Sequence, residues 1–197
     1  MKRKMNITTR RVIAITLSLV LLAVILLFSI PIPMDRTFNA IEIKLDDPSY
    51  LRECTITITG SYHLNLFSDD TFVGSIAVSG YSQTLEAMDT VYLSKEGCPL
   101  YYHRYEDGIN DEDGRPRRLE YSLGNITSGR FLHKLVIAVY SDNPLDKDVG
   151  WREGGSWGVW NERNGYCIVP DVRSYEEAVQ TLMTRGVIQQ IPVPQYP

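Results

Sequence analysis

One apolar run near the N-terminus limits what this chain can be. It begins at Val12 and ends at Ile30, it contains no ionisable residue, and three hydroxyl residues are its only polar side chains. At about 1.5 Å per residue, a helix of these 19 residues covers about 28 Å, close to the roughly 30 Å hydrocarbon core of a bilayer. We therefore predict a single transmembrane helix over residues 12–30, with membrane lipid as its partner.

Two other interpretations of this run compete with the anchor, a cleaved signal peptide and a buried helix of a soluble core. A signal peptide has an apolar region of about 7–15 residues followed by a small-residue cleavage site. Here the run is longer, and Ala40, the only small-residue candidate after it, follows the bulky Phe38. A core helix needs a polar face, which this run lacks. The uncleaved anchor is favoured, with Pro31 and Pro33 ending the helix because proline lacks the N–H group.

Charge is divided unevenly about the apolar run. Five of the 20 basic residues and no acidic residue precede Val12, which leaves 15 basic against 24 acidic residues beyond the run, a net charge of −9. Positive residues beside a membrane span stay in the cytoplasm. The sequence thus predicts a single-pass signal-anchor protein of the cell membrane, with a cytoplasmic stub (1–11), a linker (31–39) and an extracytoplasmic domain (40–197). An acidic domain also argues against nucleic acid as a partner.

The extracytoplasmic part shows the period-two alternation of apolar and polar residues that is typical of strands. A tight turn is expected at Gly60 and Ser61, and a bulge at Gly74. Residues 132–140 are apolar on nearly both faces, which predicts a central strand. The predicted strands cover residues 40–45, 54–59, 62–67, 72–78, 90–93, 100–105, 119–123, 132–140 and 166–169.

One helix is predicted near the C-terminus. Ser174 and Glu177 have the spacing of a capping box, and Gly186 suits the position just after a helix end. The apolar stripe at helical spacing consists of Tyr175, Ala178, Val179, Leu182 and Met183. Together these patterns predict a mainly β domain, an antiparallel β-sandwich or an open barrel, with one C-terminal helix covering the sheet.

The first candidate binding segment is rich in aromatic residues. Its rings, which offer large apolar faces to a glycan or protein ligand, belong to Trp151, Trp157, Trp160 and Tyr166. Core packing of Trp157 and Trp160 is the competing interpretation. Residues 154–158 also match the G-x-S-x-G pattern of a nucleophilic serine, but the strand and helix which that motif requires are missing around it. A glycine-rich loop is favoured over a catalytic one.

A second candidate is the acidic stretch of residues 106–114. Asp111, Asp113 and Glu120 have the spacing of the last part of a calcium-binding EF-hand loop, and calcium is the cofactor that they suggest. The first ligand position of such a loop would fall on Ile109, which has no side-chain oxygen, and Pro116 lies within it. A solvated hairpin loop is the competing interpretation.

Histidine and cysteine give weaker signals. The three histidines, His63, His103 and His133, fall on different predicted strands without the short spacing of a metal motif. The three cysteines allow at most one disulfide within the chain, and no base is placed beside any of them for catalysis. Neither the histidines nor the cysteines indicate a particular activity.

The leading hypothesis is a membrane-anchored protein whose extracytoplasmic β domain binds or scaffolds rather than catalyses. The alternative is an envelope-bound hydrolase with an acidic or metal-assisted site, for which the carboxylates of residues 106–113 are the candidates. Apart from the candidate calcium ion, no cofactor is expected.

Overall fold

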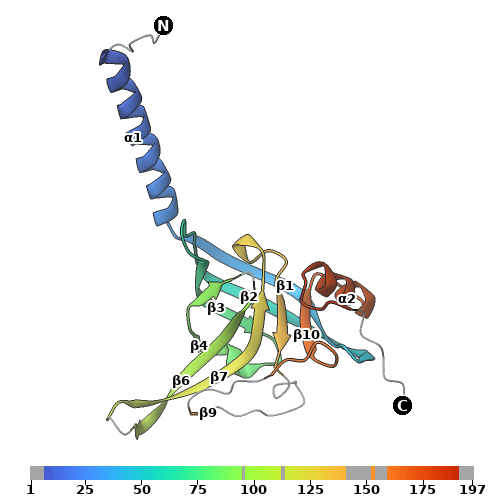
Figure 1. Cartoon of the computed structure of the whole chain (residues 1–197). Helices are drawn as coiled ribbons and strands as arrows, with labels where there is room; N and C mark the ends of the chain where they lie inside the picture. Colours follow the sequence, from blue (N-terminus) through green and yellow to red (C-terminus); the bar gives the residue numbers. More distant parts are fainter. Residues whose placement is uncertain (1–6, 95, 112–113, 141–151, 154–158, 191–197) are drawn as a thin grey trace.

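The computed structural model describes residues 7–94, 96–111, 114–140, 152–153 and 159–190 (Figure 1). The helices are α1 (Ile7–Ser29) and α2 (Tyr175–Thr184), with two short 3-10 helices, η1 (Ser82–Leu85) and η2 (Arg130–Leu132). The strands are β1 (Ile32–Lys44), β2 (Asp47–His63), β3 (Asp70–Val78), β4 (Ala87–Met88), β5 (Val91–Leu93), β6 (Cys98–Asn110), β7 (Pro116–Thr127), β8 (Val136–Val139), β9 (Arg152–Glu153) and β10 (Tyr166–Pro170).

These strands form one antiparallel sheet in the order β4-β6-β7-β8-β10-β1-β2-β3-β5, with β9 paired to β7. The sheet curls so far that its two edge regions approach each other. Strand β3 lies beside β4, and β5 lies beside β6. Across this approach the Tyr102 hydroxyl on β6 donates to the Ile76 carbonyl on β3 at 2.6 Å. The prediction of a mainly β, antiparallel domain with a C-terminal helix is confirmed. The sandwich alternative is wrong, since a single curled sheet, a half-barrel, encloses its own core.

Both faces of the curled sheet bury apolar side chains. The inner face holds the larger core, which includes Ile56, Ile58, Tyr62, Phe72, Ile76, Leu100, Tyr102, Leu123, Ile126, Ile137 and Ile168. The outer face of β1, β8 and β10 meets α2 in a second core of Ile41, Ile43, Leu45, Val136, Cys167, Val169, Ala178, Val179, Leu182 and Ile188. Alternation along β1 and β10 therefore places successive residues in two different cores.

The C-terminal helix follows its sequence signals. The Ser174 hydroxyl accepts from the Glu177 N–H at 3.2 Å. At the other end, Gly186 has φ 69°, its N–H donates to Met183, and the next N–H reaches back to Leu182 at 3.0 Å. Reverse hydrogen bonds of this kind satisfy carbonyls that a helix end leaves open. The cap and stop residues thus fix the length of α2, and its buried stripe fixes the face that packs on the sheet.

Two glycine predictions are wrong, for one physical reason. Strand β2 continues through Gly60 instead of turning there, and β3 passes Gly74 without a change of register. Gly60 lies directly opposite Gly74 on the neighbouring strand. A Cβ atom at Gly60 would lie only 2.3 Å from the Val73 carbonyl oxygen. The two glycines allow the backbones to approach closely where the sheet curls.

Two other boundaries differ from the predictions. Residues 32–39, expected as a linker, belong to β1 and pair with β2. Strand β10 joins β1 only from Ala40 onward, so Pro33 lies at a sheet edge, where a missing N–H is tolerated. The strand expected over 132–140 is shortened to β8, because Leu132 and Lys134 have φ of 52° and the chain turns there. Strand β8 is interior and buried along its length, which confirms the predicted central strand.

Helix α1 projects away from the β domain and continues into β1 (Figure 1). It includes the predicted start at Val12 but begins earlier, at Ile7. Its apolar side chains from Val12 to Ala23 are exposed, for example 64% at Leu17 and 61% at Leu21, whereas Phe28 is half-buried. Within the described part of the chain, no helix meets the length and hydropathy required of a membrane span.

Candidate functional site

The inner face of the half-barrel contains one fully buried carboxyl group, that of Glu42 on β1. The Tyr81 hydroxyl donates to its Oε1 at 3.0 Å, and the Tyr50 hydroxyl approaches the same oxygen at 3.4 Å. Glu42 pairs with Arg52 on β2 and with Ile168 on β10. Two tyrosines, one on β2 and one just before η1, therefore approach the same carboxylate on the inner face of the sheet.

The low-polarity surroundings perturb the neighbouring acids. Burial, followed by the negative charge of Glu42, raises the pKa of Cys54 to about 12. The same two causes, in the same order, raise the pKa of Tyr81 and of Tyr121. These groups stay protonated near neutral pH, so the Cys54 thiol is not a nucleophile. Tyr81 donates a hydrogen bond to Glu42, and the negative charge of Glu42 acts on Tyr121.

Replacing Tyr81 with phenylalanine should lower the free energy of unfolding by about 2 kcal/mol, because a buried carboxyl group loses a hydroxyl donor. The matched control is Tyr50→Phe. Tyr50 is half-buried and its hydroxyl lies farther from the same oxygen, so its loss should be less than about 1 kcal/mol. Urea denaturation followed by circular dichroism measures both. Equal effects of the two substitutions would contradict the assignment of Tyr81 as the main donor.

Directly outside this cluster, β2 has an open edge. Strand β3 pairs with β2 only as far as Val78, opposite Ile56. Beyond that point, the Thr55 N–H donates to the Ser79 hydroxyl at 2.8 Å and the Thr55 carbonyl accepts from the Ser79 N–H at 2.9 Å. The chain then turns inward through Tyr81. Residues 47–54 of β2 are left with β1 as their only strand partner among the described residues.

The side to which each peptide group along this edge points follows from the two-residue period of an antiparallel strand. Because the N–H and C=O groups of Thr55 face the β3 side, those of Glu53 and Leu51 face the same side. There the described part of the chain supplies no strand. Two donors and two acceptors therefore point away from the sheet in the spacing of an unfilled β-ladder.

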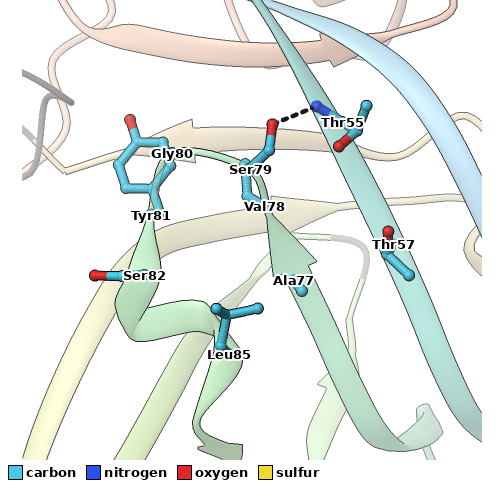
Figure 2. Close-up of a pocket in the computed structure, with 9 residues that line it drawn as sticks. All are labelled: Thr55, Thr57, Ala77, Val78, Ser79, Gly80, Tyr81, Ser82 and Leu85. Atoms are coloured by element: carbon cyan, nitrogen blue, oxygen red, sulfur yellow. Dashed lines mark hydrogen bonds between the residues drawn. The ribbon is translucent and has the colours of Figure 1, made fainter.

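Two adjoining cavities lie over this region and share Thr55 and Ser79. The first has a volume of about 430 Å³, and Figure 2 shows Leu85 of η1 opposite Thr57 of β2 across it. Its lining is Thr55, Thr57, Ala77, Val78, Ser79, Gly80, Tyr81, Ser82 and Leu85. The second, of about 550 Å³, is lined by Asn39, Ala40, Ile41, Leu51, Glu53, Cys54, Thr55, Ser79, Val172 and Arg173. We name the two cavities together the edge groove.

The predicted aromatic ligand site is only partly described. Trp151 and Trp157 lie outside the described residues. Trp160 is half-buried against the core beneath α2, and its indole N–H donates to the Tyr166 carbonyl at 3.1 Å. The Tyr166 ring lies edge-on to Tyr50 at 5.3 Å. Trp160 and Tyr166 are thus brought together, with Trp160 used in packing, and their role in ligand binding stays a prediction.

Of the predicted calcium ligands, the structure describes Asp111 and Glu120, which lie at different points of the β6–β7 hairpin. The Asp111 carboxylate accepts from the Arg115 N–H at 2.8 Å at the tip of the β6–β7 hairpin, whereas Glu120 pairs with His103 farther along it. Four residues of β7, about 13 Å of strand, separate Glu120 from Pro116 at the tip, and Asp113 lies outside the described residues. No group of three metal-ligating side chains occurs in the described ranges. Calcium binding stays a prediction.

The remaining candidates are an acidic residue of the 106–114 stretch, the histidines, the cysteines and the serine of the G-x-S-x-G pattern. Glu106, from the acidic stretch, lies 3.5 Å from Arg117 across the hairpin. The His103 imidazole lies 3.0 Å from the Asp89 carboxylate, and His133 is exposed. All three cysteines are buried and free, so the predicted option of a disulfide is not used. The serine of the G-x-S-x-G pattern, Ser156, lies outside the described residues.

Sequence reasoning missed both Glu42 and the edge groove. Glu42 alternates with Ile41 and Ile43, which is also the pattern of a strand with one solvated face. A period-two pattern cannot tell a solvated face from a polar cluster enclosed by a curled sheet. A scan against protein-family models finds no match, and neither a curated protein nor a solved structure matches the chain.

Proposed function

We propose that this protein is a membrane-anchored binding module. The anchor is α1, whose apolar side chains from Val12 to Ala23 are exposed on every side of the helix, among them Val12, Ile15, Leu19 and Leu22 at 53–61%. No described residue of α1 belongs to either buried core of the β domain. An apolar helix without such packing is stabilised by lipid. The basic residues before it favour a cytoplasmic N-terminus, and the acidic β domain then lies on the other side of the membrane.

The ligand that the edge groove fits best is an extended peptide segment of a partner protein. The observation that carries this proposal is the open edge of β2, where the peptide groups of Leu51 and Glu53 offer the hydrogen bonds of a missing strand. A peptide that adds to a sheet edge gains affinity from such main-chain bonds and specificity from side-chain pockets on alternate residues. The two cavities beside Thr55 and Ser79 supply those pockets.

Charge and polarity in the groove agree with a peptide ligand. Glu53 and Arg173 give the second cavity one acidic and one basic group, and Leu51, 42% exposed, gives it an apolar surface. A mixed lining of this kind suits a chain with alternating side chains.

The test uses the full chain in lipid nanodiscs and a phage-displayed library of extended peptides. Peptides selected on the wild type are then measured against Glu53→Pro and its matched control, Glu53→Ala. Proline removes the N–H that faces the open side while remaining compatible with an edge position. Loss of about one main-chain hydrogen bond should weaken binding of the proline variant about tenfold relative to the alanine variant.

Equal affinities of the two variants would contradict strand addition at this edge, and failure to select any peptide would favour a scaffolding role for the domain. Far-ultraviolet circular dichroism of both variants checks that proline leaves the fold intact. Leu51→Pro, with Leu51→Ala as its control, repeats the test at the neighbouring peptide group.

A further inference from the structure

We propose that the β domain makes a second contact with the same bilayer, through Leu66 and Phe67 in the connection between β2 and β3. This inference rests on the proposed anchoring by α1. We name residues 64–69 the membrane-proximal loop. Phe67 is 99% exposed and Leu66 49% exposed, so two large apolar side chains stand next to each other in water at the tip of a hairpin.

The register of the sheet places this loop beside the end of the helix. Ile32, at the start of β1, pairs with Tyr62 near the end of β2, and the loop begins two residues after Tyr62. Ile30 precedes Ile32 by two residues, about 7 Å of extended chain. Figure 1 accordingly shows the β2–β3 connection at the same end of the sheet as α1. If α1 spans a bilayer, the loop lies at the level of the headgroups.

The loop is braced internally, so the exposure of Phe67 is a feature of its fold. The Asp70 carboxylate accepts from the Tyr62 hydroxyl at 2.7 Å and from the Asn65 N–H at 2.9 Å. The Asn65 side chain donates to the Asp69 carbonyl at 2.9 Å. These bonds satisfy the polar groups at the base of the loop and leave its two apolar side chains pointing away from the sheet.

A third apolar side chain lies at this end. Phe131 in η2 is 36% exposed, and its ring centroid lies 4.9 Å from that of Tyr62. Its φ of 57° is unfavourable for a residue with a side chain, and such backbone is kept only where the surroundings enforce it. Tyr62 thus connects Phe131 with the membrane-proximal loop, and the apolar surface at this end spans two connections of the half-barrel.

The occupant of this surface follows from its position. Aromatic and aliphatic side chains at the end of a membrane helix insert into the interfacial region of a bilayer. Exposed apolar side chains lie on both sides of this junction, because Ile30, 61% exposed, follows α1 and the loop is brought beside it by the pairing of Ile32 with Tyr62. A lipid interface is therefore the partner that covers α1 and the loop at once.

The experiment measures depth in the membrane with a nitroxide spin label on the full chain in phosphatidylcholine–phosphatidylglycerol vesicles. The label is attached at Phe67→Cys, at Leu19→Cys in α1, and at Leu85→Cys as the matched exposed control. Leu85 is 76% exposed and lines a cavity with Ala77, which lies seven residues, about 23 Å, along β3 from Asp70. The buried native cysteines should label little, and the unsubstituted protein gives that background.

The label at position 67 is expected to gain access to oxygen and lose access to a water-soluble nickel complex, relative to the label at position 85. Equal nickel access at positions 67 and 85, with position 19 inside the hydrocarbon, would overturn this inference and leave the anchoring by α1 standing. A label at position 19 that reports water would instead overturn the anchoring itself, and this inference with it. Leu66→Cys, which keeps Phe67, repeats the measurement without removing the aromatic ring.

Discussion

Above about pH 10 this protein should lose stability steeply, because its half-barrel buries several tyrosines that must stay protonated. Burial is the first cause of a raised pKa at Tyr81, Tyr102 and Tyr121. Burial, followed by the hydrogen bond to Asp70, raises the pKa of Tyr62 to about 12. In the unfolded chain these groups ionise near pH 10, so the unfolded state releases protons that the folded state holds.

The sign and size of the effect follow from that difference. Each folded-state pKa lies above its unfolded value, so the stabilisation is complete below about pH 10 and is lost as the pH rises towards the folded-state values. One such group changes the free energy of unfolding by about 1.4 kcal/mol per pH unit. Tyr81, Tyr102 and Tyr121 together give about 4 kcal/mol per pH unit, against a typical total of about 5–15 kcal/mol.

Urea denaturation of the full chain in nanodiscs between pH 7.5 and pH 11 measures this slope. The part of the tyrosinate absorbance that Tyr102→Phe removes should appear together with unfolding and not before it, because Tyr102 is fully buried. Tyr102→Phe should reduce the slope by the contribution of one tyrosine, about 1.4 kcal/mol per pH unit. Tyr92→Phe, at a position 62% exposed, should leave the slope unchanged. Stability that is constant up to pH 11, or ionisation of Tyr102 in the folded protein, would contradict the enclosed inner core.

Gly60→Ala should lower the free energy of unfolding by about 3 kcal/mol, because the added methyl group meets backbone that cannot move aside. A Cβ atom there would lie 2.3 Å from the Val73 carbonyl oxygen and 2.7 Å from the Gly74 Cα. Phe72 closes the same space from the inner face, with a ring carbon at 2.9 Å. Relief of this clash would require β2 and β3 to separate where Gly60 pairs with Gly74.

The matched control is Gly108→Ala in the β6–β7 hairpin. Gly108 has nothing within 4 Å of the added carbon, but its φ of 74° is unfavourable for alanine, at about 1 kcal/mol. Thermal and urea unfolding compare Gly60→Ala, which adds a steric clash to an unfavourable φ of 159°, with Gly108→Ala, whose effect is conformational alone. If Gly60→Ala is no more destabilising than Gly108→Ala, the close approach of β2 and β3 is contradicted.

The parts of the fold that could be predicted are those set by neighbours in sequence. Helix α2 begins at the residue after Ser174 and stops just before Gly186, because capping and termination depend on side chains within one or two turns. The strands were recognised because alternation is a local pattern, and the central position of β8 because its residues are apolar on both faces. Local signals therefore gave the elements and the class of the domain.

The candidate site could not be predicted, because its parts are distant in the chain. Tyr81 reaches Glu42 across 39 positions, and the edge groove exists because β3 stops pairing at Val78 while β2 continues. Gly60, interpreted as a turn, is a close contact with a glycine that only the register identifies. For Trp160 the sequence left ligand binding and core packing open, and its packing beneath α2 depends on a helix that begins 15 residues later.

By itself the sequence determined the apolar N-terminal segment, the separation of basic and acidic regions, the mainly β composition and the capped helix. Each of these depends on composition or on contacts within a few residues, which short-range physics decides. Only the tertiary structure decided that one sheet curls on itself, that Glu42 is enclosed, and that residues 47–54 of β2 form an open edge. Burial and strand pairing are properties of the folded chain, because they depend on which segment, distant in the sequence, packs beside a residue.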